Sequence, residues 1–148
     1  MTIVNDIFSN SVFICAVIGW FSSQGIKMFL TFMQIGRFDL ERLMGSGGMP
    51  SSHTASIMAA TFQIGQAYGY DHPAFGLGLV MALIVMYDAT NVRMAAGRQA
   101  KLIKQIVTRL GEHHFQIEKE LKELLGHTYL EVLVGMVLGI CIGILYNN

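Results

Sequence analysis

Long stretches without a charged side chain constrain this chain more than any other feature. The first runs from Ile7 to Ile26, and later ones cover 54–70, 75–87 and 132–146. The chain is 53% hydrophobic and only 14% charged, whereas soluble domains have about 25% charged residues. Because a membrane-spanning helix needs about 20 mostly apolar residues, the sequence predicts a single integral membrane domain covering 1–148.

The predicted fold is all-α, a bundle of about four transmembrane helices with a short amphipathic surface insertion. The helices are expected at roughly 8–35, 50–68, 74–97 and 127–146, and the insertion at roughly 98–125. Within the insertion, charges of both signs accompany two apolar stripes at helical spacing, with Gly111 between them. We interpret the insertion as two short helices that lie on the membrane surface or cap the bundle.

A polar segment, Gly-Gly-Met-Pro-Ser-Ser-His, precedes the second apolar run. Gly48 permits a close backbone approach, and Pro50 suits the first turn of a helix. Ser51, Ser52 and the free N–H groups of that turn would bind an anion, and His53 adds a proton donor near neutral pH. The alternative interpretation is a serine-capped helix with an incidental histidine.

Charged side chains also interrupt the first and third predicted helices. Lys27 lies near the end of the first helix, where it either snorkels to the interface or faces a polar cavity. The second half of the third helix carries Asp88, Asn91, Arg93 and Arg98. These residues either line a site or form an Asp–Arg pair that only ties helices together.

The last predicted helix begins with a histidine and a carboxylate. His127 and Glu131 are four residues apart, so on a helix they would share a face one turn apart. A carboxylate in that position holds an imidazole in one tautomer and stabilises its positive form. Alone, such a pair is also a common feature of a helix start.

The order of these residues along the chain suggests that they meet. Lys27 and Arg93 lie towards the exits of the first and third helices, and His53 and His127 lie at the entries of the second and fourth. Four alternating passes would put all of them on the same side of the membrane. Two histidines, cationic side chains and a helix N-terminus are suited to phosphoryl transfer without a metal.

Several other classes of function receive no support. The formal net charge is zero, which gives no indication of nucleic-acid binding. Cys15 and Cys141 lie in apolar runs and are expected to be buried thiols. Glu112, His113 and His114 lack a further ligand at a matching spacing. We therefore expect no metal and no cofactor, and the sequence leaves homo-oligomerisation open.

The same residues resemble a known family. Pro50-Ser51-Ser52-His53 is similar to the Pro-Ser-Gly-His motif of the type 2 phosphatidic acid phosphatases, which are related to vanadium haloperoxidases. The stretch His-Thr-Tyr-Leu-Glu-Val-Leu-Val-Gly at 127–135 resembles that family's closing His-x-x-x-Asp motif, followed by Val-Leu-x-Gly. Nearly the whole chain is similar to the divergent branch of this family.

The resemblance implies a role for each matching residue. His127 would attack phosphorus and form a phosphohistidine, supported by Glu131, and His53 would protonate the leaving group. Ser51 would bind the phosphate. Lys27 would be the lysine of the family's first motif.

The chain departs from the family pattern at two arginines. Gln34 stands where the first motif has Arg-Pro, so Arg37 or Arg42 would substitute for that arginine. Leu121 stands where the closing motif has its arginine, and Arg93 would replace it. Missing arginines would weaken neutralisation of the transition-state charge.

These observations together predict a membrane phosphatase acting on a lipid phosphate or diphosphate monoester that enters sideways from the bilayer. The alternative is a non-catalytic membrane protein that binds an anionic lipid headgroup or has a structural role. Lys and Arg crowd the segments after the first and third helices. The positive-inside rule therefore places the predicted site on the cytoplasmic side.

Overall fold

A computed structural model describes residues 2–36, 48–109 and 126–146 of the 148-residue chain. All regular elements in these ranges are helical, which confirms the predicted all-α class. The elements are, in order, α1 (Ile3–Phe8), α2 (Ser11–Ile35), α4 (Ser52–Tyr68), α5 (Pro73–Tyr87), the π-helix η1 (Asp88–Val92), α6 (Arg93–Arg109) and α8 (Tyr129–Leu145).

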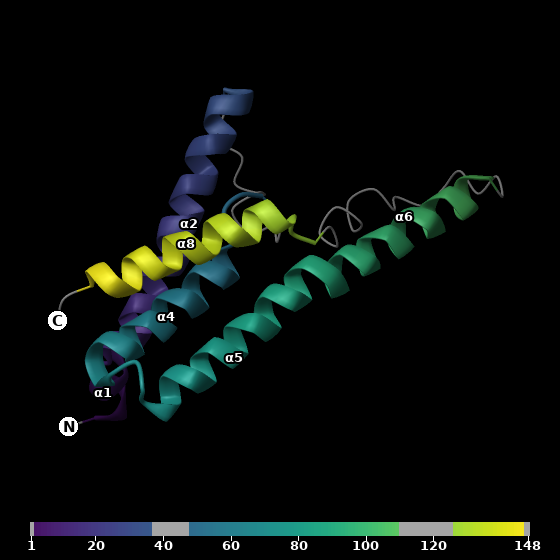
Figure 1. Cartoon of the computed structure of the whole chain (residues 1–148). Helices are drawn as coiled ribbons and strands as arrows, with labels where there is room; N and C mark the ends of the chain where they lie inside the picture. The colour runs from purple at the N-terminus through teal and green to yellow at the C-terminus, as the bar shows by residue number, and fades with distance from the viewer. Residues whose placement is uncertain (1, 37–47, 110–125, 147–148) are drawn as a thin grey trace.

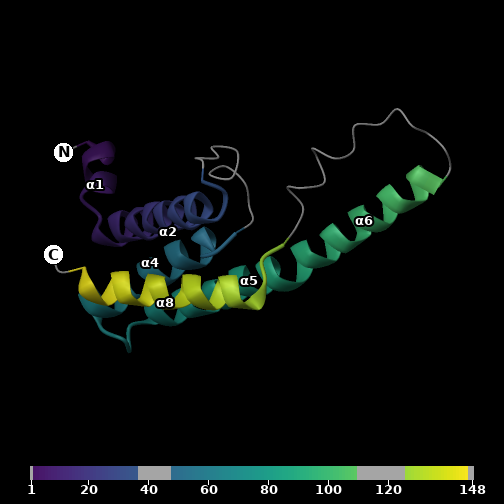
Figure 2. The same cartoon turned by 90° about the horizontal axis from the view of Figure 1, so that it is seen from above.

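Helix α4 lies at the centre of the bundle and packs against α2, α5 and α8. Figure 1 shows α4, α5 and α8 running alongside one another, while α2 crosses them steeply. Seen from above in Figure 2, α4 lies between α2 and the layer formed by α5 and α8. The central helix therefore has neighbours on most of its faces, and it contributes the largest share of the buried side chains.

Three glycines of α8 allow it to approach α4 closely. Gly135, Gly139 and Gly143 recur every fourth residue, and a Cβ on any of them would lie 2.5–2.6 Å from an atom of α4 or its N-cap. Small residues at this spacing are typical of tightly packed helices in membranes. The contact fixes the start of α8 beside the start of α4, which is where the candidate site lies.

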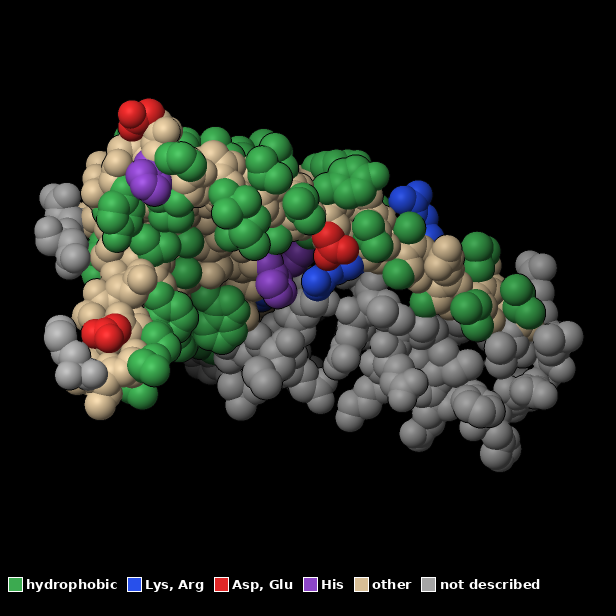
Figure 3. Space-filling view, turned by 90° about the horizontal axis from the view of Figure 1, so that it is seen from below, with side chains coloured by type: hydrophobic (Ala, Val, Ile, Leu, Met, Phe, Trp, Pro, Cys, Tyr) green, Lys and Arg blue, Asp and Glu red, His purple; other side chains and the backbone are tan. Residues whose placement is uncertain are grey.

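Apart from Met58 and Val132, the buried side chains among the described residues are polar or small, whereas many large apolar side chains face outwards (Figure 3). Leu77, Leu83, Ile84 and Leu130 are 61–63% exposed. This distribution is the reverse of that in a soluble domain and is typical of helices that pack together in lipid. The buried polar side chains include Ser23, Gln24, Lys27, Thr31, Thr54, Thr61, Gln63 and Thr90.

The two cysteines differ in environment. Cys15 is buried on α2, as predicted, but Cys141 is exposed on α8. The prediction for Cys141 is wrong because this residue lies between Gly139 and Gly143, which face α4, and so points to the opposite side of the helix.

In the part of the chain that the structure describes, two helical segments are long and apolar enough to cross a membrane. They are Ser11–Ile35, with 25 residues, and the continuous segment Pro73–Ile103, with 31 residues. Tyr129–Leu145 is apolar but shorter, and α4 has 17 residues. The helical membrane bundle is thus supported in part, and the crossing of the membrane by all four helices stays a prediction.

Polar caps decide where the helices begin. The Asn10 side chain accepts the N–H of Phe13 at 3.1 Å, so α2 starts at Ser11 rather than near residue 8. Ser51 caps α4 in the same way. Pro50 therefore lies before the N-cap and not in the first helical turn, as the sequence had suggested, because the serine hydroxyl and not the proline ring sets the helix start.

The third helix is much longer than predicted. Helices α5, η1 and α6 are continuous from Pro73 to Arg109, and Figure 1 shows α6 projecting beyond the bundle. The predicted end at 97 is wrong because residues 98–109 are mostly strong helix formers and Gly97 alone is a weak helix breaker. The rest of the predicted insertion, 110–125, lies outside the described residues.

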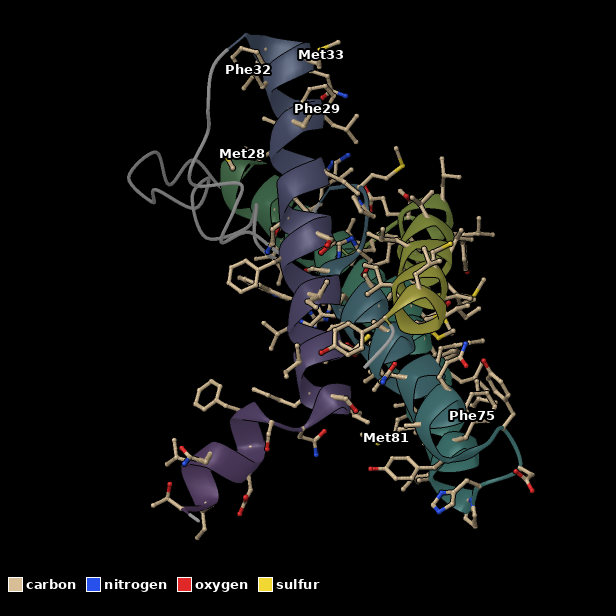
Figure 4. All side chains as sticks on the ribbon, turned by 90° about the vertical axis from the view of Figure 1, so that its left-hand side faces the viewer. Met28, Phe29, Phe32, Met33, Phe75 and Met81 are labelled. Atoms are coloured by element: carbon tan, nitrogen blue, oxygen red, sulfur yellow. The ribbon has the colours of Figure 1, made fainter. Side chains whose placement is uncertain are left out.

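The last turns of α2 also leave the bundle. Figure 4 shows Met28, Phe29, Phe32 and Met33 around this end of the helix. Phe29 is 62% and Met33 is 70% exposed, whereas Lys27 and Thr31, one turn apart on another face of the helix, are buried. The polar interior therefore extends along α2 as far as Thr31.

Candidate active site

The backbone before α8 holds His127 against the π-helix. The N–H of His127 donates to the carbonyl of Ala89 at 3.0 Å. Gly126 makes this approach possible, since a Cβ there would lie 2.5 Å from the backbone nitrogen of Met94. The His127 residue is only 1% exposed, so its imidazole is fixed inside the bundle rather than on its surface.

The π-helix frees the carbonyl that His127 uses. In an α-helix the N–H of Arg93 would donate to Ala89, but here it donates to the carbonyl of Asp88. The Ala89 carbonyl can then accept the bond from His127. Single π-helical turns inside α-helices frequently mark functional sites. The sequence pattern did not predict η1, because an uninterrupted α-helical period was expected across these residues.

Glu131 holds both the ring of His127 and the start of α8. Its Oε2 lies 3.1 Å from Nδ1 of His127 and accepts the N–H of Thr128 at 2.9 Å. The Thr128 hydroxyl accepts the N–H of Glu131 in return, which completes a capping box. The predicted pairing of His127 with Glu131 is confirmed. However, α8 begins at Tyr129, after His127. The capping box at Thr128, and not a helical turn between the two residues, therefore brings them together.

The second ring nitrogen of His127 is left available. Nε2 is buried and has no hydrogen-bond partner among the described residues. A carboxylate at Nδ1 favours the tautomer that carries its proton there, which leaves a lone pair on Nε2. This arrangement is suited to a nucleophile.

Lys27 faces the interior of the bundle and does not snorkel. It is 4% exposed, and its Nζ has no partner among the described residues. It lies close enough to Glu131, His127 and His53 for Coulombic interaction. Of the two alternatives that the sequence left open, the burial of Lys27 contradicts snorkelling, and a polar cavity around it stays a prediction.

Gly48 lies against the aliphatic stem of Lys27. A Cβ on Gly48 would lie 3.4 Å from Cγ and Cδ of Lys27. Its φ of +95° is a conformation that favours glycine. The glycine of the predicted anion-binding segment therefore lies directly against the predicted cation.

The serines of that segment are buried in the cap of α4. Ser51 is 0% and Ser52 is 4% exposed. The Ser51 hydroxyl accepts from both the backbone N–H and the hydroxyl of Thr54, at 3.5 and 3.0 Å, and its own N–H donates to the Glu131 carbonyl at 3.0 Å. Ser51 thus ties the starts of α4 and α8 together, and phosphate binding by the two serines stays a prediction.

His53 lies in the first turn of α4 but is exposed. Among the described residues, no hydrogen bond holds its ring. Arg93, His127, Lys27 and Asp88 are all close enough to interact with it electrostatically. The two histidines and two cations therefore lie near one another, and their convergence on an anion stays a prediction. Figure 3 shows histidine, acidic and basic side chains meeting on one face, bordered by hydrophobic surface.

Asp88 and Arg93 form an ion pair across η1. Nε of Arg93 donates to Oδ2 of Asp88 at 2.9 Å, and the side chains are 43% and 41% exposed, respectively. Asn91 turns elsewhere, since its amide donates to the Thr90 hydroxyl at 3.1 Å and its Oδ1 lies 3.5 Å from the Tyr129 hydroxyl. Asn91 therefore makes its hydrogen bonds outside the Asp88–Arg93 pair.

Some predicted residues cannot be placed. Arg37 and Arg42, the two candidates for the missing arginine, lie outside the described residues, as do Leu121 and 112–114. Within the described ranges, no group of three or more His, Cys, Asp or Glu side chains is arranged to hold a metal ion. Independence from metal ions stays a prediction that only activity measurements can test.

Comparison with known proteins agrees with the resemblance seen in the motifs. The uncharacterized membrane protein YuiD of Bacillus subtilis (strain 168) is 34% identical over 129 residues, which cover 80% of this chain and 82% of that protein. No solved structure matches the chain. A family model described as the Divergent PAP2 family matches residues 8–142, a range that includes every described site residue. This chain therefore belongs to the Divergent PAP2 family.

Proposed function

We propose that this protein is a membrane-embedded phosphatase that hydrolyses a lipid phosphate or diphosphate monoester through a phosphohistidine intermediate. One observation carries the proposal. His127 is buried, its Nδ1 is held by Glu131, and its Nε2 has no partner among the described residues. Two cations, Lys27 and Arg93, lie within Coulombic range of the ring. A fixed imidazole with a free lone pair beside positive charge is suited to attack on an anionic phosphoryl group.

The first step transfers the phosphoryl group to the protein. The Nε2 lone pair of His127 forms a bond to phosphorus while the bond from phosphorus to the lipid oxygen breaks. The departing oxygen takes a proton from His53, whose exposed position suits it to exchange protons. Lys27 and Arg93 balance the charge that builds up on the phosphoryl oxygens.

The second step releases phosphate. His53, now neutral, takes a proton from water as the water oxygen attacks phosphorus. The bond from phosphorus to Nε2 breaks, inorganic phosphate leaves, and His127 returns to its starting tautomer. Glu131 stabilises the positive imidazole ring while the phosphoryl group is attached.

We further propose that the chain is a multi-pass integral membrane protein with its site on the cytoplasmic side. The exposed apolar side chains, the two segments long enough to span a membrane and the membrane-protein name of the Bacillus subtilis relative support membrane insertion. Lys and Arg lie after the first and third helices, which supports the orientation. In a variant without native cysteines, Ser46→Cys should be inaccessible to an external thiol reagent and Asn148→Cys accessible; the reverse pattern contradicts this orientation.

Phosphate release from purified protein in detergent tests the catalytic proposal. The substrate panel should include a phosphatidate and an isoprenyl diphosphate, and rapid acid-free quenching should trap the phosphoenzyme. We expect release with the wild-type protein and none with His127→Ala. If the wild-type protein binds the lipids but forms neither phosphate nor phosphoenzyme, the alternative of a non-catalytic headgroup-binding protein is favoured.

A further inference from the structure

Two hydrogen bonds join Asp88 and Arg93 across the π-helix. The backbone N–H of Arg93 donates to the Asp88 carbonyl, and the side-chain Nε donates to Oδ2 at 2.9 Å. Residues five apart lie on different faces of an α-helix, whereas the i to i+5 bonding of a π-helix aligns them. The pairing is therefore a product of η1 itself.

The contact uses only one part of the guanidinium group. Arginine has five N–H donors in a planar fork, and four of them belong to the two terminal nitrogens. Asp88 takes the single donor on Nε, and no other described residue bonds the group. A guanidinium held by Nε has a fixed plane, and its terminal nitrogens are free to bind a phosphate in bidentate fashion.

The guanidinium lies beside the proposed reaction centre. Arg93 is close enough to both His53 and His127 to interact with them electrostatically. Asp88 also lies within Coulombic range of His53. A carboxylate so near an anion site would repel the anion, so its presence needs a compensating role.

We propose that Asp88 is a positioning residue, which holds Arg93 by Nε so that the terminal nitrogens of Arg93 face the phosphate. The inference rests on the proposed function for its catalytic part, but it also predicts how the protein binds inorganic phosphate. Removing the carboxylate should then weaken phosphate binding, although it removes a negative charge. A carboxylate that merely lies nearby would have the opposite effect.

Calorimetric titration of inorganic phosphate into the detergent-solubilised full chain tests whether removing the carboxylate weakens or strengthens phosphate binding. We expect Asp88→Ala and Arg93→Lys each to weaken binding by on the order of 10- to 100-fold, as expected for losing a hydrogen bond to a charged group. Asp88→Asn should keep most of the affinity, since its side-chain oxygen can still accept from Nε. Asp71→Ala, which removes an exposed carboxylate from the turn after α4, is the matched control and should bind phosphate normally.

A double-mutant cycle separates positioning from a general structural effect. In an Arg93→Ala background, Asp88→Ala should cause no further loss of phosphate binding, because there is no guanidinium left to orient. In the hydrolysis assay, Asp88→Ala and Arg93→Lys should lower kcat/KM, and Asp88→Asn should lower it less. Additive losses, or tighter binding by Asp88→Ala, would overturn the inference.

The two proposals fail in different ways. Wild-type protein that binds phosphate but releases none from lipids would contradict the proposed function, and the binding cycle would still decide the role of Asp88. Hydrolysis with unchanged phosphate affinity and kcat/KM in Asp88→Ala would contradict only the positioning role. Wild-type protein that binds no inorganic phosphate would also contradict the positioning role of Asp88.

Discussion

The segments that carry the two histidines are built in different ways, although both begin a helix. In 126–131, His127 is 1% exposed, its backbone is bonded to Ala89, and its ring is bonded to Glu131. In 48–54, the serine cap is fully buried but His53 is exposed, and no described residue bonds its ring. One histidine is fixed and the other is not.

This difference matches what the two proposed roles require. A nucleophile must be held in line with phosphorus, and small displacements reduce the rate strongly. A general acid must exchange protons with water and reach leaving groups of different shape. The contrast therefore indicates which histidine has which role without reference to the family motifs.

The largest effect is expected from removing the fixed histidine. His127→Ala removes the covalent route, so it should be inactive on every substrate and form no phosphoenzyme. His72→Ala, which removes an exposed histidine from the turn before α5, should retain activity and serves as the control. A phosphoenzyme in His127→Ala would show that the nucleophile lies elsewhere.

A smaller and selective effect is expected at the exposed histidine. His53→Ala should lose about 10²- to 10⁴-fold on a lipid phosphate, the usual range for general acid catalysis. It should lose much less on a nitrophenyl phosphate, whose leaving group is already stable as an anion. Rapid-quench experiments should still detect the phosphoenzyme. Equal losses on the two substrates would contradict the assignment of His53 as the acid.

The backbone of the fixed segment offers a third test. Gly126→Ala would place a Cβ 2.5 Å from the Met94 nitrogen and 2.9 Å from the Ala89 oxygen, backbone atoms that cannot easily move. His127 should shift, and kcat should fall on the order of 10²-fold. Gly76→Ala on α5 has nothing within 4 Å of its new Cβ and should leave kcat unchanged. A normal rate in Gly126→Ala would mean that the position of His127 does not depend on this contact.

The smallest effect is expected from removing metal ions. Since histidines and cations perform all the proposed steps, hydrolysis should continue at an unchanged rate in a chelator. Vanadate, which mimics five-coordinate phosphorus, should inhibit and should protect His127 from chemical modification more than the exposed His53. Loss of activity in the chelator that magnesium restores would require a different mechanism.

The sequence predicted those parts of the site that depend on local chemistry. The pairing of His127 with Glu131 and the serine at the start of α4 followed from short motifs, and the structure contains both. The long third helix and η1 did not follow. A single glycine and a few charges suggest a helix end at 97, but whether a helix stops there depends on the summed propensity of the residues beyond it.

The contacts between segments far apart in the chain could not be predicted from the sequence either. Nothing near Ala89 indicates that its carbonyl accepts a bond from a residue 38 positions later. The glycines of α8 did carry a signal, because their four-residue spacing is typical of close helix packing. That signal could have predicted the contact of α8 with α4, but not the alignment that brings Glu131 beside Ser51.

The π-helix also restricts how the length of this chain can change. The i to i+5 bond of a π-helix spans one residue more than the α-helical bond at about the same rotation, so deleting one residue between Ala89 and Met94 would let α5 and α6 join as one α-helix in nearly their present register. In that helix the N–H of Met94 would donate to the Ala89 carbonyl, which now accepts the bond from His127. A one-residue deletion should therefore preserve the helix and yet release His127 from it.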